Sequence, residues 1–141
     1  MTKLEQYYKL SREKSQLLWQ DKDYYLSFLR TAGQLYKYEF HDQLLIHAQN
    51  PAATACAEYD FWNDESKMNR YIKRGSKGIA LIDQSGARHR LRYVYDVSQT
   101  GRRDERSKDP YLWEVNENNR QMVIDVLGST AEHLDTAIME K

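Results

Sequence analysis

Apolar positions recur with helical spacing through the N-terminal part of the chain. Between Leu4 and Trp19 they fall near one stripe, and no glycine or proline interrupts them. A second helix is predicted after Asp21 or Asp23, because either side chain can cap it. Its apolar positions have the i, i+3, i+4, i+7 spacing of an amphipathic helix: Tyr25, Phe28, Leu29, Ala32, Leu35 and Tyr36. The chain is therefore predicted to open with two helices.

Shorter elements are predicted next. Asp42 can cap a third helix that runs through Ala48 and ends at Asn50-Pro51, since proline cannot continue a helix. Residues 53–58 fit either a short strand or the start of a helix. Residues 59–68 are predicted to form a fourth helix with Phe61 and Trp62 facing inward.

The pattern then becomes typical of strands. The apolar run 79–82 is followed by a turn-forming segment, 83–86, and then by residues 88–97, which are rich in β-branched and aromatic side chains. This order predicts a β-hairpin, or part of a small antiparallel sheet. A charged loop is expected over 101–109 and a helix over about 116–127, where Gly128 stands at a C-cap position.

These elements predict an α+β fold in which N-terminal helices pack on a small antiparallel sheet or hairpin, with a C-terminal helix. The 141 residues suffice for a single domain, 1–141, whose core spans about 1–127; residues 128–141 are either a further helix or a frayed end. The 17 aromatic residues argue against disorder, and the single cysteine excludes an intrachain disulfide framework. No apolar stretch approaches the roughly 18 residues of a membrane helix, and the first residues lack a signal segment, so a cytoplasmic protein without membrane contact is expected. The oligomeric state is not predicted.

Charge is unevenly distributed, although 21 basic and 21 acidic residues cancel. Residues 31–65 carry six acids and one base, and residues 111–141 carry six acids and two bases. Residues 66–92 carry eight bases and one acid, Asp83. Such a local excess produces a positive field even when the total charge is zero. It indicates an anionic partner, although a solvated surface with grouped charges is the alternative.

The basic region contains two features suited to nucleic acid. Residues 70–79 hold two glycines three apart, which let the backbone approach a phosphate while lysines and arginine supply countercharge. This segment is not a P-loop, since it lacks that spacing and precedes a strand. Alternation along the returning strand places three guanidiniums on one face, and nearby tyrosines can stack on unpaired bases. The candidate nucleic-acid-binding residues are Lys67, Arg70, Tyr71, Lys73, Arg74, Gly75, Lys77, Gly78, Arg88, Arg90, Arg92, Tyr93 and Tyr95.

A structural role is the alternative for each of these residues. Any single tyrosine fits a half-buried position in a sheet or core, and the arginine row fits an exposed edge strand protected from aggregation by its charge. Enzymatic chemistry finds less support. The pairs Tyr7-Tyr8 and Tyr24-Tyr25 could suggest the tyrosine nucleophile of a nicking enzyme. That chemistry needs a metal-binding His-hydrophobic-His element, which the four histidines do not form. The potential zinc ligands His41, His47, Cys56 and Glu58 lack a suitable spacing, and Cys56 has no evident base. No catalytic residue, metal or cofactor is predicted.

Several segments resemble a known family: 28–32, 36–57, 62–63, 70–81 and 95–100. Together they are similar to the N-terminal domain of ArdC-type antirestriction proteins. The similarity is greatest to the variant that opens very large helicase- and methylase-like proteins of conjugative elements from Gram-positive gut bacteria. For ArdC itself, the basic glycine turn and the Val-Ser-Gln-Thr strand end match well. The resemblance covers roughly residues 1–115. It implies an α+β domain that binds single-stranded DNA and helps an incoming element evade host restriction.

By position, the residues that match the family's basic turn are Arg70, Lys73, Arg74, Gly75, Lys77 and Gly78. Residues 95–100 match a strand end to which the resemblance assigns no role. Two departures matter. The chain lacks the His-Glu-x-x-His helix of ArdC's metalloprotease-like domain, so no catalysis follows, and it stops at Lys141 where the large proteins continue. Whether it is free-standing or a fragment stays open.

The leading hypothesis is a non-enzymatic module of a mobile genetic element that binds single-stranded DNA. The alternative is a protein–protein inhibitor of a host defence nuclease, an anti-CRISPR or antirestriction factor, in which the acidic segments could mimic DNA. A third interpretation is a docking domain that links larger catalytic parts.

Overall fold

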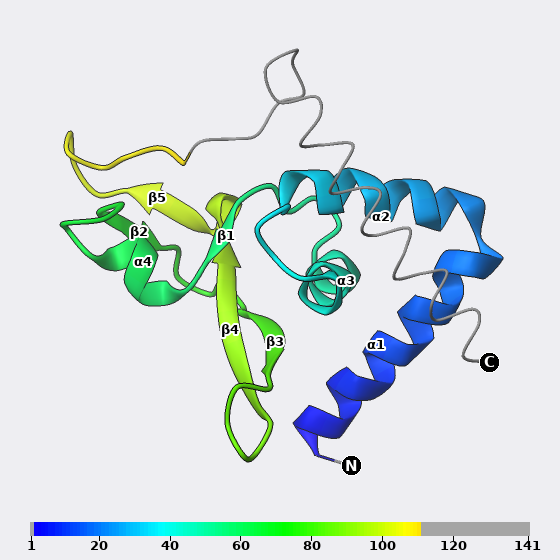
Figure 1. Ribbon diagram of the computed structural model, residues 1–141. Helices are drawn as coiled ribbons and strands as arrows, with labels where there is room; N and C mark the ends of the chain where they lie inside the picture. The colour runs from blue at the N-terminus through cyan, green and yellow to red at the C-terminus, as the bar shows by residue number, and fades with distance from the viewer. Residues whose placement is uncertain (1, 111–141) are drawn as a thin grey trace.

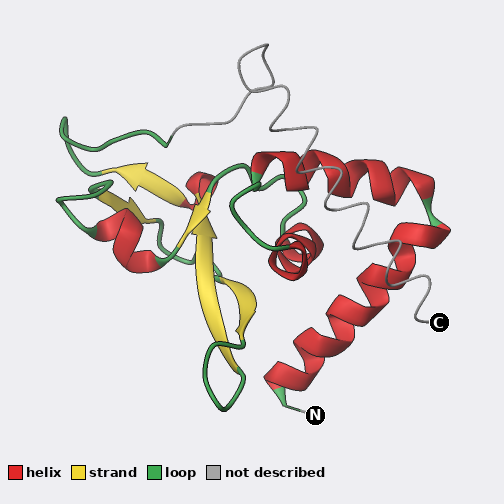
Figure 2. Cartoon of the chain, in the orientation of Figure 1, coloured by secondary structure: helices red, strands yellow, loops and turns green. Residues whose placement is uncertain are grey.

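Four helices and five short strands make up the part of the chain that the computed structural model describes, residues 2–110 (Figures 1 and 2). The predicted α+β class is confirmed. The elements are α1 (Lys3–Gln20), α2 (Lys22–Gln34), α3 (Phe40–Gln49), β1 (Cys56–Ala57), α4 (Tyr59–Asn63), β2 (Arg70–Ile72), β3 (Ile79–Asp83), β4 (Arg90–Asp96), the 3-10 turn η1 (Val97–Gln99) and β5 (Thr100–Arg102). Among these residues no helix combines the length and apolarity needed to cross a bilayer. The helix predicted over 116–127 and the segment 128–141 lie outside the described residues.

The first two helices form where they are predicted and share one capping residue, but α2 ends at Gln34, before the predicted helix positions Leu35 and Tyr36. The Thr2 hydroxyl accepts a hydrogen bond from the Glu5 amide (3.1 Å) at the start of α1. The backbone N–H of Asp21 closes α1, and its carboxylate accepts the Tyr24 amide (3.1 Å) to start α2. Asp21 therefore fixes the sharp bend between the two helices.

The third helix begins two residues before the predicted cap. Its N-cap is Glu39, which makes no capping bond, and Asp42 lies inside the first turn. Burial explains the earlier start: the Phe40 ring meets the Phe28 ring edge-on at 5.7 Å, and the Gln43 amide donates to the Leu35 carbonyl (3.1 Å). The helix ends at Asn50, as Asn50-Pro51 predicts.

The fourth helix is shorter than predicted. It stops at Asn63 because the Asp64 carboxylate accepts both the amide and the hydroxyl of Ser66, which forms a tight turn instead of another helical turn. Trp62 is buried as predicted, and its indole N–H donates to the Tyr95 carbonyl (2.8 Å). The prediction for Phe61 is wrong: this side chain is 41% exposed, because a single short helix can bury only one side.

The strands form two antiparallel sheets, one of three strands in the order β1-β4-β3 and one of the two strands β2 and β5. β3 pairs with β4 over Ile79↔Val94 to Asp83↔Arg90, which confirms the predicted hairpin. β1 pairs with the other edge of β4, which resolves the ambiguity at residues 53–58 in favour of a strand. Further along the same two chain segments, β2 pairs with β5. The expected loop at 101–109 is thus partly a strand, because β5 supplies the partner that β2 needs.

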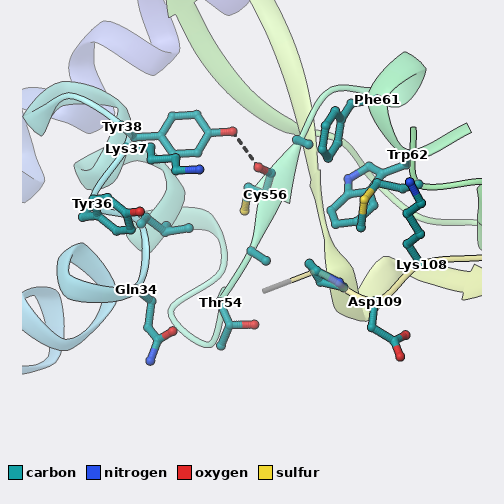
Figure 3. Close-up of a pocket in the computed structure, with 15 residues that line it drawn as sticks. Gln34, Tyr36, Lys37, Tyr38, Thr54, Cys56, Phe61, Trp62, Lys108 and Asp109 are labelled. Atoms are coloured by element: carbon teal, nitrogen blue, oxygen red, sulfur yellow. Dashed lines mark hydrogen bonds between the residues drawn. The ribbon is translucent and has the colours of Figure 1, made fainter. Parts of the chain in front are cut away.

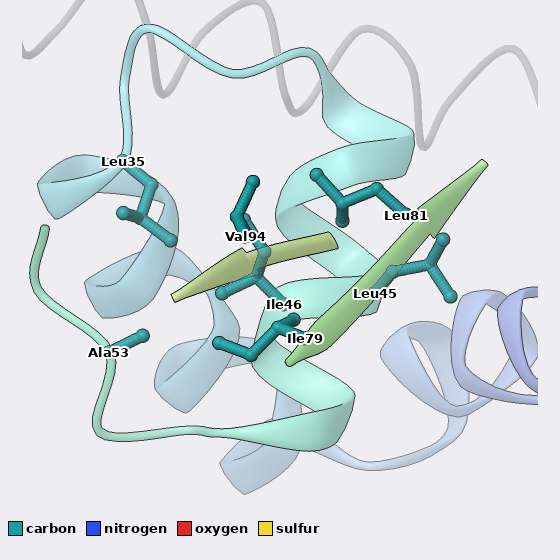
Figure 4. Close-up of a cluster of buried hydrophobic side chains, with 7 residues drawn as sticks. All are labelled: Leu35, Leu45, Ile46, Ala53, Ile79, Leu81 and Val94. Atoms are coloured by element: carbon teal, nitrogen blue, oxygen red, sulfur yellow. The ribbon is translucent and has the colours of Figure 1, made fainter. Parts of the chain in front are cut away.

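The core lies between the hairpin and the helices. α3 packs between the hairpin and the helices α1 and α2 (Figure 1). One cluster joins α3 to the sheet: Leu35, Leu45, Ile46, Ala53, Ile79, Leu81 and Val94 (Figure 4). A second joins the three long helices: Leu18, Phe28, Ala32, Phe40 and Leu44.

The outer edge of β3 is closed by a side chain. The Gln49 amide accepts a hydrogen bond from the Ala80 backbone N–H (2.9 Å) and donates one to the Ala80 carbonyl (2.8 Å). A glutamine from α3 therefore takes the place of a neighbouring strand, which protects an edge that would otherwise be open to pairing.

Replacing Phe28 by alanine tests the helical core. Phe28 is fully buried, so Phe28→Ala is expected to lower the free energy of unfolding by about 3–5 kcal/mol. Urea unfolding followed by circular dichroism measures this change. Phe61→Ala is the matched control, since it removes the same side chain from an exposed site and should cost less than about 1.5 kcal/mol. Equal losses would contradict the core assignment.

Candidate nucleic-acid interface

The basic turn, residues 73–78, connects β2 to β3. Gly75 adopts a φ of +84°, a left-handed conformation that favours glycine, and the Ser76 amide donates to the Lys73 carbonyl (3.1 Å). Lys73, Arg74 and Lys77 are exposed, and no described carboxylate pairs with them. Three cationic side chains thus share one glycine-containing turn, as the sequence predicted.

Backbone donors accompany these charges. Among the described residues, nothing accepts a hydrogen bond from the backbone N–H of Arg74, Gly75 or Lys77. Exposed N–H groups beside lysine and arginine side chains are the donors that a phosphate oxygen requires. The turn can therefore offer both countercharge and hydrogen bonds to an anion.

Gln99 of η1 holds the basic turn in place. Its side-chain amide donates to the Lys77 carbonyl (2.7 Å) and accepts from the Asp96 amide (2.9 Å). Its backbone carbonyl accepts the Lys73 amide (2.8 Å). The turn is thus bonded to η1 near both of its ends, which limits the conformations available to it before any ligand binds.

Asp96 and Thr100 fix η1 in turn. The buried Asp96 carboxylate accepts the Ser98 amide (3.1 Å) and hydroxyl (2.6 Å), and the Thr100 hydroxyl donates to the Val97 carbonyl (2.8 Å). These contacts give residues 95–100 a role that the sequence resemblance left unassigned: they support the basic turn. The signal was present as a capping box, with aspartate and glutamine three residues apart.

A shallow hollow of about 450 Å³ adjoins the turn. Lys77, Gly78, Tyr93 and Tyr95 line it on one side. The Tyr93 ring packs on Gly78, where an added Cβ would lie 3.1 Å from the Tyr93 Cβ. The other side comes from α1, through residues that the sequence analysis did not select: Lys3, Gln6 and Tyr7. Their spacing marks only one helix stripe, so their position beside the turn could not be predicted.

Two of the three candidate tyrosines are exposed. Tyr93 and Tyr71 are each 44% exposed, whereas Tyr95 is half-buried and its ring meets that of Tyr59 at 6.5 Å. Tyr71 covers Gly101 on the paired strand, where an added Cβ would lie 2.5 Å from its hydroxyl oxygen. Tyr71 therefore packs across the β2–β5 pair, and Tyr93 is the tyrosine best placed beside the basic turn.

The predicted row of three free guanidiniums does not form. Arg88 precedes β4, and Arg90 and Arg92 share a strand face with Val94, which points into the core. Arg90 pairs with Asp83 (3.1 Å). Arg92 bonds Asp42 (3.0 Å) and Glu58 (3.3 Å); burial raises the pKa of Asp42, and this arginine partly offsets that shift. The predicted alternation of side chains along β4 is correct, but Arg90 and Arg92 lie on the strand face that the helices cover.

Arg70 serves the fold as well. It is 7% exposed, and its guanidinium donates to the Thr100 hydroxyl (2.9 Å), the Lys108 carbonyl (3.2 Å) and the Asp109 carboxylate (3.0 Å). A buried arginine with these partners ties β2 to the segment after β5. It is therefore unsuited to contact a ligand.

The remaining candidates, Lys67 and Arg88, are exposed outside the basic turn. Lys67 lies in the turn before β2, and Arg88 lies in the β3–β4 connection. Beside Arg88, the His89 ring is hydrogen-bonded through Nδ1 to the Tyr8 hydroxyl, which joins this connection to α1. Neither Lys67 nor Arg88 lines the hollow beside the basic turn.

The residues considered for zinc do not converge. The ring nitrogens of buried His47 face the Ser27 hydroxyl (2.9 Å) and the Tyr24 hydroxyl (3.4 Å), and burial lowers the pKa of the imidazole. Burial and the neighbouring Asp96 carboxylate raise the pKa of the Cys56 thiol. Within residues 2–110 no group of three or more potential ligands could hold a metal ion.

Comparisons of the chain with protein-family models, with curated proteins and with solved structures give no match.

Replacing Gln99 tests whether it holds the basic turn. Gln99→Ala removes the bond to the Lys77 carbonyl, and amide hydrogen exchange at Lys73 and Ser76 is expected to accelerate about fivefold, as for the loss of ~1 kcal/mol. Gln84→Ala is the control, because Gln84 bonds Tyr8 in another part of the molecule. Unchanged exchange in Gln99→Ala would show that the turn is held without this side chain.

Proposed function

We propose that this protein is a non-enzymatic module that binds single-stranded DNA at the basic turn and the adjoining hollow. The observation that carries the proposal is the turn itself: three exposed cations that pair with no described carboxylate, and backbone N–H groups that donate to no described residue, held by Gln99 before a ligand arrives. The setting suggested by the sequence resemblance is protection of a mobile element from host restriction during transfer.

The distribution of positive charge favours an anionic polymer as the ligand rather than a single small anion. Lys73, Arg74 and Lys77 belong to one short turn, and Lys77 lines the adjoining hollow together with Lys3 of α1. Lysine and arginine contacts to successive phosphates position a nucleic acid without reading its sequence. The affinity for nucleic acid should therefore depend strongly on salt and weakly on nucleotide sequence.

Aromatic side chains support an unpaired strand rather than a duplex. Tyr93 is exposed beside Lys77, and Tyr95 lines the same hollow. Bases can stack on tyrosine only when they are unpaired, and stacking tolerates every base. The combination of a charged turn and an exposed ring is typical of proteins that bind single strands.

Charge reversal tests the phosphate contacts. Lys73→Glu/Arg74→Glu is expected to weaken binding of a fluorescein-labelled single-stranded oligonucleotide at least about tenfold and to reduce the salt dependence. If about four phosphates are contacted, log K for the unmodified chain should fall with log salt at a slope of about −3. Fluorescence anisotropy at several salt concentrations measures both quantities.

The matched control for this variant is Lys22→Glu/Arg30→Glu, which changes the net charge equally on exposed positions of α2. Its affinity should stay close to that of the unmodified chain. Equal losses in the two variants, or no binding at low salt, would contradict the proposal. A duplex of the same sequence should bind more weakly than the single strand.

Replacing Tyr93 tests the stacking contact. Tyr93→Ala is expected to cost about 1–3 kcal/mol of binding free energy, whereas Tyr93→Phe keeps the ring and should retain nearly full affinity. Anisotropy titrations at fixed salt give both values, and circular dichroism checks that each variant is folded. If the phenylalanine variant loses as much as the alanine variant, the hydroxyl rather than the ring makes the contact.

A further inference from the structure

A second hollow, of about 500 Å³, lies between the segment that joins α2 to α3 and the region around α4 (Figure 3). Mainly apolar side chains line this groove: Leu35, Tyr38, Cys56, Phe61, Trp62 and Met68. It shares no lining residue with the hollow beside the basic turn. The groove is therefore a separate surface, and nothing in the proposed DNA binding uses it.

The walls of the groove are fixed by internal hydrogen bonds. The Tyr38 hydroxyl donates to the Cys56 carbonyl (2.8 Å) across the groove's base, and the Trp62 indole donates to the Tyr95 carbonyl (2.8 Å). Burial also raises the pKa of the Tyr38 hydroxyl. The polar atoms of both aromatic walls are thus satisfied, which leaves apolar ring surface for a ligand. A preformed apolar hollow loses little entropy on binding.

Phe61 is the exposed part of this surface. Its ring lies at the groove and is 41% exposed, while the neighbouring Trp62 is buried. Because this ring faces solvent, a partner's apolar side chain can cover its exposed edge.

Charge at the groove selects the partner. Among the described residues, the one carboxylate that lines it is that of Asp109, which accepts hydrogen bonds from Arg70 (3.0 Å) and Arg102 (3.3 Å). Lys37 and Lys108 extend from opposite walls, and no described carboxylate pairs with either ammonium (Figure 3). The charges left for a ligand are therefore two separated cations on either side of an apolar floor.

We propose that this groove binds an extended segment of a partner protein in which large apolar side chains are flanked on both sides by acidic residues. The apolar side chains would cover Phe61 and fill the hollow, and the flanking carboxylates would meet Lys37 and Lys108. Desolvated apolar contacts supply most of the affinity in such interfaces, while the rim charges select the partner.

A fluorescein-labelled peptide with a central phenylalanine–leucine pair between two glutamates on each side probes the groove. Anisotropy titration with the full 141-residue chain should show saturable binding. Lys37→Glu/Lys108→Glu should weaken it at least about tenfold, and Phe61→Ala about as much. The same peptide with lysines in place of glutamates should bind at least about tenfold more weakly.

Lys73→Glu/Arg74→Glu is the matched control, because it reverses as much charge at the basic turn. It should leave peptide affinity unchanged, just as Lys37→Glu/Lys108→Glu should leave oligonucleotide affinity unchanged. Equal weakening of peptide binding by both double variants would show a response to net charge rather than to the groove and would overturn the proposal, as would absence of binding. Trp113 follows Pro110, which lines the groove, by three residues in the sequence. Binding that appears only after Trp113→Ala would also overturn the proposal, since the chain's own segment after Pro110 would then be the occupant.

Discussion

The structure depends on one buried carboxylate. Asp96 is 2% exposed, and its oxygens accept the amides of Thr54 (2.9 Å) and Ala55 (3.1 Å) as well as the amide and hydroxyl of Ser98. A buried carboxylate is costly unless hydrogen bonds replace its water, and four N–H and O–H donors do so here. The side chain thereby fastens the segment before β1 and the start of η1 to the end of β4.

The candidate interface follows from that anchor. Because Asp96 fixes η1, Gln99 points back at the basic turn and bonds the Lys77 carbonyl (2.7 Å). The η1 turn also separates β4 from β5, which pairs with β2 in a second sheet. A glycine turn with exposed cations is thus carried on a rigid support, and rigid elements hold a binding site more accurately than an untethered loop does.

Counting charges along the chain overstates the positive surface. Of the eight bases between residues 66 and 92, Arg70, Arg90 and Arg92 are bonded to carboxylates, and Arg70 is buried. Paired charges of this kind hold elements together and contribute little field at a distance. In the described part of the chain, no carboxylate pairs with Lys67, Arg88 or the cations of the basic turn, of which Lys73 donates to the Ser98 carbonyl (3.3 Å). Lys37 and Lys108 give the groove a separate cationic rim. Two surfaces of different chemistry therefore exist on one small fold.

Local pattern alone determined the long helices, the hairpin and the glycine turn, because each depends on residues close together in the sequence: the Asp21 cap, the apolar spacing of α2 and the run before Asp83. Tertiary structure decided which strand face the helices cover, and hence that Arg92 meets Asp42, 50 residues away. It also decided that Phe61 faces outward and that Lys3 and Tyr7 of α1 come beside Lys77. Pairing of charges and lining of hollows join residues that are distant along the chain, and alternation or helical period carries no information about such partners.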